Sequence, residues 1–417
     1  MLQGHPSGFW AQLHDGLKAD GHRVLKVHFC FADFVFWGRR PAVSYRGRYK
    51  NWRDWIEHYI QAEQVTDVFY YADRLPYHAD TLQVAENLDV RCWAIEFGYL
   101  RPDWITMEPE GMGAFSTFPK SQDGIEALAR IAEAPDLMLR YPHTFLTEAF
   151  NEVTYHLLQA TGRPFYPLYF SDKIYWPIID YLSWIGELAR GHRRKRHAED
   201  VQKLTAADGI SFNLIAMQIQ ADYQIRASSP YDHISEFLSE VFQSFARSAP
   251  PSRQLVIKLH PLDNGLERWF SRIPTMARAA GIDGRIHLIK GGDLSAFIQN
   301  SRGVVMINST VGIHALRFGI STYAAGESVF DLPGLTHQGE LDTFWTKPEP
   351  VDRGFFEKFQ TALTHIQIKG SFYNPDGRTA AIQGIRDRMN KPALAVFDDE
   401  TPVAQHQSTA QQHEDQT

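Results

Sequence analysis

The chain has 417 residues, of which 44% are hydrophobic and 22% are charged, and its formal net charge is −7. This length favours two domains over one, and the composition is that of a globular protein with ordinary cores. The acidic balance excludes a general nucleic-acid binder, because such proteins need a basic face. The sequence shows neither a signal peptide nor an apolar run of about 18 residues, so we expect a cytoplasmic protein.

Strands and helices alternate in the first half. Residues 1–4 resemble the end of a strand whose start is missing, and a Gly/Pro turn follows them. The predicted elements are a helix over 9–20, a strand from 22, a helix over 52–64, a strand over 66–72, a helix over 78–88 and a strand over 90–96, and then helices over 122–133, 141–161 and 173–190. They predict a Rossmann-like domain over 1–200 with a helical insertion over 121–197.

A basic run, GHRRKRH at 191–197, marks the predicted domain boundary. A second alternating series predicts another Rossmann-like domain over 201–345, with helices closing the fold within 346–397 and a polar, disordered tail over 398–417. Its strands are expected over 210–218, 255–259, 285–290, 304–307 and 321–326, and its helices over 231–249, 266–281, 294–300 and 311–318. The predicted fold class is therefore α/β with two Rossmann-like domains facing across a cleft, an arrangement like GT-B.

The two cysteines, Cys30 and Cys92, lie in apolar runs and are expected to be buried, reduced thiols. The sequence contains neither Cys/His ligand spacing nor an Asp-x-Asp pair nor a P-loop. We therefore expect no metal and no cofactor.

Polar residues end the predicted strand over 255–259. His260, held by Pro261, is expected to point into the cleft beyond the strand, with Lys258 on the same strand face. A cation and an imidazole together suit the phosphate of a nucleotide. The alternative is that His260 caps a local turn and Lys258 is solvated.

Asn308, Ser309 and Thr310 follow another apolar strand and precede a helix. Ser and Thr are N-cap residues, and the start of a helix offers backbone N–H groups and the positive end of its dipole. This arrangement binds phosphate readily. Ordinary helix capping is the alternative.

Two carboxylates are candidates for chemistry. Asp222 lies just after the first strand of the second domain, where it could serve as nucleophile or base; a local turn is the alternative. Glu96 closes an apolar strand beside Trp93 and Phe97, where burial raises the pKa of a carboxyl group and suits it to handling a proton. A salt bridge to Arg101 is the alternative for Glu96.

Further residues of the first domain lie at strand ends and could line an acceptor pocket, with helix-cap and turn roles as the alternative. They are Asp33, Asp73, Arg74, His78 and Arg101.

An aromatic-rich amphipathic helix runs into the basic cluster. Trp184, Arg193, Arg194, Lys195 and Arg196 form a pattern typical of contact with an anionic membrane surface. A helix packed on the core and followed by a solvated linker is the alternative.

Several longer segments resemble the capsule polysaccharide biosynthesis and export family, and within it the KpsS type of β-Kdo transferase. They include YYADRLPYH, AIEFGYLRPDWIT, ADYQIRASSPY, VIKLHPLDNG, INSTVGIHAL and GSFYNPDG, and the resemblance runs from about Gly4 to Gly377. It is carried most specifically by EFGYLRPDW and by the pairing of the Lys-Leu-His-Pro and Asn-Ser-Thr segments.

The resemblance implies a GT-B-like, retaining enzyme that moves Kdo from CMP-Kdo to a (lyso)phosphatidylglycerol acceptor at the inner membrane, where other capsule synthesis and export proteins are its partners. It assigns the CMP contacts to Lys258, His260, Ser309 and Thr310. Retention by two inversions needs a carboxylate nucleophile, for which we choose Asp222, with Glu96 handling the proton.

Two alternatives stay open at this point. One is a non-catalytic export or assembly protein that binds the glycolipid, and the other is a transferase or epimerase that uses a uridine nucleotide. Carboxylates facing the phosphate site across the cleft would favour an enzyme.

Overall fold

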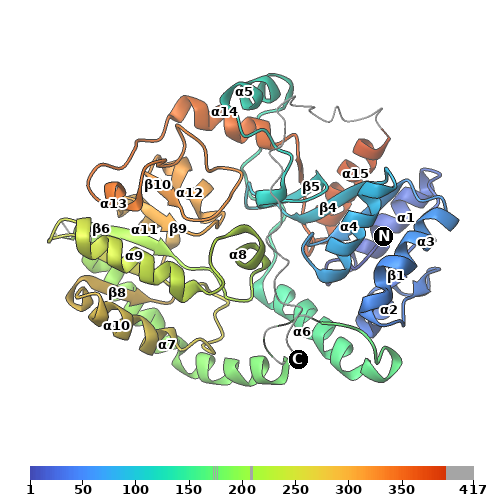
Figure 1. Ribbon diagram of the computed structural model, residues 1–417, viewed down its shortest axis with the longest axis horizontal. Helices are drawn as coiled ribbons and strands as arrows, with labels where there is room; N and C mark the ends of the chain where they lie inside the picture. Colours follow the sequence, from blue (N-terminus) through green and yellow to red (C-terminus); the bar gives the residue numbers. More distant parts are fainter. Residues whose placement is uncertain (172, 174, 176, 207–209, 391–417) are drawn as a thin grey trace, which may run out of the picture.

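The structure is a computed structural model, which describes residues 1–171, 173, 175, 177–206 and 210–390. Two α/β halves lie side by side, the first at the right of Figure 1 and the second at the left. The first half contains α1 (Phe9–Ala19), β1 (Val27–His28), α2 (Phe31–Trp37), β2 (Val43–Ser44), α3 (Trp52–Ala62), β3 (Asp67–Tyr71), α4 (Pro76–Asn87), β4 (Arg91–Phe97), β5 (Trp104–Pro109), α5 (Gln122–Ile131) and α6 (Phe145–Thr161). The second half contains α7 (Pro177–Ala206), β6 (Phe212–Ala216), α8 (Tyr223–Ser228), α9 (Ile234–Ser248), β7 (Gln254–Lys258), α10 (Trp269–Ala279), β8 (Ile286–Ile289), α11 (Leu294–Asn300), β9 (Val304–Met306), α12 (Val311–Phe318), β10 (Thr322–Ala324) and α13 (Leu341–Phe344).

The strands described for the second half form one parallel sheet in the order β10-β9-β6-β7-β8. This is the doubly wound order, in which the winding direction reverses between the first and fourth strands along the chain. Here those strands are β6 and β9. Both are buried along their whole length, and all of their residues except Asn213 are apolar. Parallel strands covered on both faces need such continuous apolar runs. A ligand crevice is therefore expected where β6 and β9 end.

The sheet of the first half combines parallel and antiparallel strands. β3 and β4 are parallel, whereas β5 runs antiparallel to β4. Residues 1–3 lie between β1 and β3, because Val27 N–H donates to the Met1 carbonyl at 3.0 Å and Leu2 N–H donates to the Phe69 carbonyl at 2.8 Å. β1 also pairs with β2. The first half thus repeats the doubly wound order, with its own reversal between residues 1–3 and β3.

After the second half the chain returns to the first. It forms α14 (Arg353–Leu363), β11 (Gln367–Lys369) and α15 (Pro375–Met389). β11 pairs antiparallel with β5, and α15 packs on α1. The predicted closing helices are present, but the strands β5 and β11 were not predicted. β11 has only three residues, and β5 is buried along almost its whole length and so lacks clear alternation.

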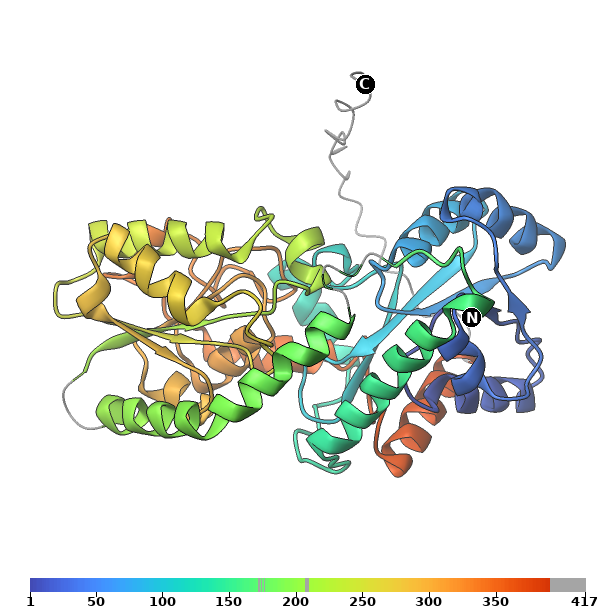
Figure 2. The ribbon, with the colours of Figure 1, turned by 90° about the horizontal axis from the view of Figure 1, so that it is seen from below.

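The basic run predicted to mark a domain boundary lies inside a helix. α7 continues without a break from Pro177 to Ala206, so this run is part of a helical surface and not a linker. Figure 2 shows α6 in front of the first half and α7 in front of the second half. Within the described part of the chain, none of the helices combines the length and the apolar character needed to cross a membrane.

Most other predicted elements are present within a few residues. The strand expected from residue 22 is shorter, since only Val27 and His28 pair as β1 and α2 begins at Phe31. Cys30 and Cys92 are buried free thiols, as predicted. The tail predicted to be disordered, 398–417, lies outside the described residues.

Candidate active site

A pocket of about 420 Å³ lies between the two halves. Its walls come mainly from residues at or after the carboxyl ends of β3, β4, β6, β7 and β9. Ligands of doubly wound sheets bind at this edge. The polar residues that line it are Tyr71, Asp73, Arg74, Glu96, Tyr99, Arg101, Gln218, Asp222, Tyr223, His260, Asn308, Ser309, Thr310, Glu327 and Ser328.

Gln218 and Asn308 join the two strand ends at the reversal point of the second sheet. The Gln218 amide nitrogen donates to Asn308 Oδ1 at 2.9 Å, and Asn308 N–H donates to Gln218 Oε1 at 3.2 Å. Asn308 Nδ2 also donates to the Ser228 carbonyl at 3.1 Å. Asn308 was predicted to lie here, but Gln218 was not. Its signal was the same as that of Asn308, a polar residue two positions beyond an apolar strand.

The N-terminus of α12 lies at the pocket. Thr310 is its N-cap residue, and Ser309 Oγ accepts a hydrogen bond from Val311 N–H at 3.3 Å. Both hydroxyl residues line the pocket, and the positive end of the helix dipole lies with them. Gly319, with φ of 70°, ends the helix in the left-handed region that glycine favours. The arrangement suits an anion such as a phosphate.

His260 lines the pocket from the end of β7. Leu262 N–H donates to its Nδ1 at 3.1 Å, which leaves the ring proton on Nε2. Burial lowers the pKa of His260 to about 4, and the positive charges of Arg101, Lys258 and Lys290 act in the same direction. At neutral pH His260 is therefore an uncharged ring whose Nε2–H can donate to an oxygen.

Lys258 and Pro261 do not line the pocket with His260. Lys258 is buried, and its Nζ donates to the Gly291 carbonyl at 2.6 Å. The amine therefore supports the loop after β8, in contrast to the predicted phosphate contact. Pro261 is exposed. Lys258 was predicted to lie on the same strand face as His260, but β7 ends at Lys258 and only His260 lines the pocket.

Glu96 lines the pocket from the end of β4. Burial raises its pKa to about 7, and this rise is opposed by a hydrogen bond with the Tyr71 hydroxyl, by the Phe97 N–H and by the charge of Arg101. The Phe97 N–H donates to Glu96 Oε1 at 3.2 Å. A carboxyl group with this pKa exchanges a proton readily at neutral pH.

Arg101 does not form the alternative salt bridge with Glu96. Its Nε donates to the Gly98 carbonyl at 3.4 Å, and its guanidinium lies 5.5 Å from the centre of the Phe97 ring. It lines the same pocket, as predicted for an acceptor-side residue. The partner of Glu96 is Tyr71, which sequence reasoning did not identify.

Asp222 lines the pocket from the opposite half. It directly precedes α8, a six-residue helix that was not predicted because it is too short to show a helical period. Gln218 Nε2 donates to Asp222 Oδ2 at 3.4 Å, and Asp222 N–H donates to the Ile219 carbonyl at 2.9 Å. The local turn offered as the alternative is therefore present, and it holds the carboxylate at the pocket.

Asp73 and Arg74 line the first-half wall. Asp73 Oδ2 accepts hydrogen bonds from Met112 N–H at 3.0 Å and from Arg74 Nε at 3.1 Å. The Arg74 guanidinium lies 3.4 Å from the centre of the Phe115 ring. Asp73 thus fixes the loop after β5, while Arg74 supplies a positive charge to the wall.

Asp33 and His78 lie away from this pocket. Asp33 is buried, accepts hydrogen bonds from Phe29 N–H and the Tyr155 hydroxyl, at 2.9 Å and 2.7 Å, and helps to cap α2. His78 is fully buried, and its Nδ1 lies 2.9 Å from the Ala72 carbonyl. For these two residues the structural alternative holds, and neither lines the predicted acceptor pocket.

Glu327 is a further carboxylate at the pocket that was not predicted. It follows the short strand β10, and its N–H donates to the Ser228 carbonyl at 3.0 Å. Among the residues that the structure describes, clusters of three His, Cys, Asp or Glu side chains suited to a metal ion are absent.

The predicted membrane-contact residues divide into two groups. Arg193, Lys195 and Arg196 are exposed on α7. Arg194 instead pairs with buried Glu187, and Trp184 is partly buried with Lys290 Nζ 5.4 Å from its ring centre. The last two side chains therefore pack on the protein.

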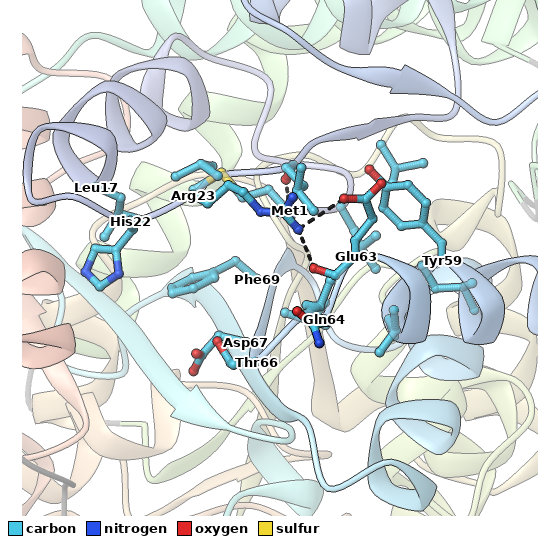
Figure 3. A pocket seen from close by; sticks show the side chains of 18 of the residues that line it. Met1, Leu17, His22, Arg23, Tyr59, Glu63, Gln64, Thr66, Asp67 and Phe69 are labelled. Carbon is cyan, nitrogen blue, oxygen red and sulfur yellow. Dashed lines mark hydrogen bonds and ion pairs between the residues drawn. The ribbon is translucent and has the colours of Figure 1, made fainter.

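A second pocket lies at the other edge of the first sheet. Figure 3 shows this pocket of about 220 Å³, which is lined by Met1, Thr66 and Asp67 at the start of β3 and by the Arg23–Glu63 ion pair. Because it opens at the amino ends of the strands, it is not where a doubly wound sheet binds its ligand.

Residues 66–373 match the family described as capsule polysaccharide biosynthesis protein, and the chain belongs to that family. The capsule polysaccharide modification protein LipB of Neisseria meningitidis is 28% identical over 383 residues, which cover 90% of this chain and 91% of LipB. The capsule polysaccharide export protein KpsS of Escherichia coli is 27% identical over 379 residues, which cover 89% of this chain and 96% of KpsS. Among solved structures, the β-Kdo 2,7 transferase KpsC of Thermosulfurimonas dismutans is similar with 13% identity and a TM-score of 0.43, covering 93% of this chain and 98% of that one.

Proposed function

We propose that the protein is a retaining glycosyltransferase that moves β-Kdo from CMP-Kdo to a (lyso)phosphatidylglycerol acceptor, and so starts the poly-Kdo linker of a capsular polysaccharide. The observation that carries the proposal is that Glu96 and Asp222, from different halves, line the same pocket as His260 and the start of α12. The choice of CMP-Kdo rests on the resemblance to KpsS-type transferases, and the relatives LipB and KpsS bear capsule names.

The donor is proposed to bind to the second half without a metal. The phosphate of CMP lies at the start of α12, where Ser309 and Thr310 hydroxyls and the helix dipole meet it. His260 donates through Nε2–H to a phosphate oxygen. These groups stabilise the negative charge that grows on CMP as it leaves.

The transfer is proposed to take two steps. In the first, the Asp222 carboxylate attacks the anomeric carbon of Kdo, the bond from that carbon to the phosphate oxygen breaks, and CMP leaves with the electron pair. In the second, the acceptor hydroxyl attacks the same carbon, its proton passes to Glu96, and the bond to Asp222 breaks. Two inversions give net retention.

The test is to incubate the protein with CMP-Kdo and a fluorescent lysophosphatidylglycerol, and to read product mass and anomeric configuration. We expect a mass gain of one Kdo in the β configuration. Asp222→Asn should give no such product, because it keeps the side-chain size and removes the nucleophile.

CMP and UDP binding, measured by calorimetry, separates the competing functions. CMP binding without any product on lipid or lyso-lipid would contradict transfer and favour a glycolipid-binding export or assembly protein. Preference for UDP over CMP would favour a uridine-nucleotide enzyme.

A further inference from the structure

Exposed apolar side chains are concentrated in one part of the molecule. Among the described residues, 20 large hydrophobic side chains are exposed, and 11 of them lie between Leu146 and Leu188. This segment contains α6, the first part of α7 and the stretch between them. Large contiguous apolar patches on a protein surface mark interaction sites.

The outer face of α6 is an apolar stripe. Leu146, Phe150, Val153 and Leu157 are 76%, 72%, 44% and 57% exposed. Their spacing of four, three and four residues places them on one side of the helix. Tyr155, on the opposite side, is buried against the first half. The helix is amphipathic, but only its polar and aromatic face is covered by protein.

The first part of α7 also exposes apolar residues. Ile179, Leu182, Ile185 and Leu188 are between 54% and 75% exposed. The next turns of the same helix carry the basic run over 191–197, in which Arg193, Lys195 and Arg196 are exposed and acidic residues are missing. The protein as a whole has a net charge of −7, so this positive cluster is local.

Both helices lie along the lower edge of Figure 1 and face the viewer in Figure 2. The inner face of α6 is also close to the proposed catalytic groups. Tyr373 on the first half donates to Glu152 of α6 at 3.5 Å. Tyr71, the partner of Glu96, is acted on by the charges of both Glu96 and Glu152.

We propose that the outer face of α6 and the first part of α7 insert into the surface of a bilayer, while the basic run of α7 binds its anionic phospholipid headgroups. This inference rests on the proposed function only in the expectation that the acceptor is a lipid. An amphipathic helix with an apolar face and an adjacent Lys/Arg cluster binds anionic membrane surfaces through both. A bilayer can cover two separate helices at once, whereas a protein partner would have to match both in shape.

The first experiment measures partition of the full chain onto vesicles of phosphatidylcholine and phosphatidylglycerol by co-sedimentation, without donor. Leu146→Ser and Phe150→Ser together should lower the partition coefficient about tenfold or more, because both side chains leave water on insertion. Ile131→Ser is the matched control, since Ile131 is 68% exposed but lies at the end of α5, at the top of Figure 1.

The second experiment neutralises the basic run with Arg193→Gln, Lys195→Gln and Arg196→Gln. Binding to vesicles with phosphatidylglycerol should fall by about fivefold per charge at low salt, while binding to pure phosphatidylcholine stays unchanged. Added salt should weaken the wild type and leave the triple variant almost unaffected.

Wild-type partition in the α6 double variant would overturn the proposal, as would equal losses in that variant and in Ile131→Ser. If the α6 double variant changed its oligomeric state in size-exclusion chromatography without a change in vesicle binding, the proposal would also be overturned. The face would then belong to a contact with a second copy of the chain. Transfer to a soluble short-chain acceptor does not depend on this face, so a failure here is distinguishable from a failure of the proposed function.

Discussion

The sheets of the two halves share the same strand order, but the crevices at their reversal points differ. In the second half, Gln218 and Asn308 follow the strands and line an open pocket. In the first half, His5 follows residues 1–3 and is almost fully buried, with its ring stacked on Phe372 at 4.1 Å and its edges against Tyr71 and Tyr373. One crevice is open and is the proposed binding site, and the other is filled by aromatic rings.

The difference shows that topology offers a crevice but that the residues after the strands decide its use. The filled crevice packs the edge of the first half with aromatic rings, and from this edge Glu96 and Tyr71 reach the shared pocket. The open crevice holds the phosphate site that we propose for the second half. The proposed division is therefore that the second half binds the donor and supplies the nucleophile, while the first half supplies the base.

The largest effect is expected from Asp222→Asn. Loss of the nucleophile should lower the turnover number by roughly 10³-fold or more, while CMP affinity stays within about twofold because the phosphate site is intact. Transfer is followed by mass spectrometry and CMP binding by calorimetry. Glu327→Gln is the control, since it removes another carboxylate of the same pocket. If the turnover number of Asp222→Asn stayed within tenfold of wild type, Asp222 would not be the nucleophile.

The pH profile tests the first-half carboxylate. Glu96 has a pKa of about 7 and accepts a proton only when ionised, so turnover should rise with pH through about 7 and fall about tenfold per unit below it. His260, with a pKa of about 4, stays neutral from pH 5 to pH 9 and adds no second limb near 7. Glu96→Gln should give a low, flat profile. A limb near pH 7 that persists in Glu96→Gln would exclude Glu96 as the base.

The donor site is tested by His260→Ala. The lost hydrogen bond to a charged oxygen is worth about 1.5–3 kcal/mol, so the KM for the donor should rise at least tenfold. His287→Ala is a matched control, because His287 is a partly buried histidine of β8 outside this pocket. If His260→Ala and His287→Ala had equal KM values for the donor, His260 would not be a donor-binding residue.

The filled crevice is tested by His5→Ala, which has the smallest expected effect on activity. The cavity left among the aromatic rings should lower the free energy of unfolding by about 2–3 kcal/mol, with CMP affinity unchanged. His5→Phe should recover part of the stability, since an aromatic ring can still stack on Phe372. Chemical denaturation and calorimetry give the two values. Weaker CMP binding at unchanged stability would mean that the first crevice also holds donor.

Much of the fold could be predicted because apolar runs and helical periods are local signals. β6, β7 and β9 are mostly apolar runs, and α11 and α12 were predicted at their observed bounds. β5, β11 and α8 were missed for the opposite reason. α8 and β11 are short and β5 lacks alternation, and β11 pairs with β5, which is far from it in the sequence.

The site could be predicted at the level of strand ends but not of individual side chains. His260, Asn308, Ser309, Glu96 and Asp222 reach the pocket. Lys258 and Asp33 carry similar polar groups at strand ends, yet hydrogen bonds hold them in other parts of the fold. Gln218 and Tyr71 were missed because each contributes through a hydrogen bond that only the fold reveals. Gln218 bonds to Asn308, and Tyr71 bonds to Glu96.

The return of the chain to the first half has a consequence for how the protein is made. β11 covers the edge of β5, and Arg386 of α15 donates to Asp20 just after α1 at 2.7 Å. The strand that covers this edge is therefore translated only after the whole second half, and until then the edge of β5 has no partner. Open edges recruit other strands, and the first half to emerge is the last to be completed.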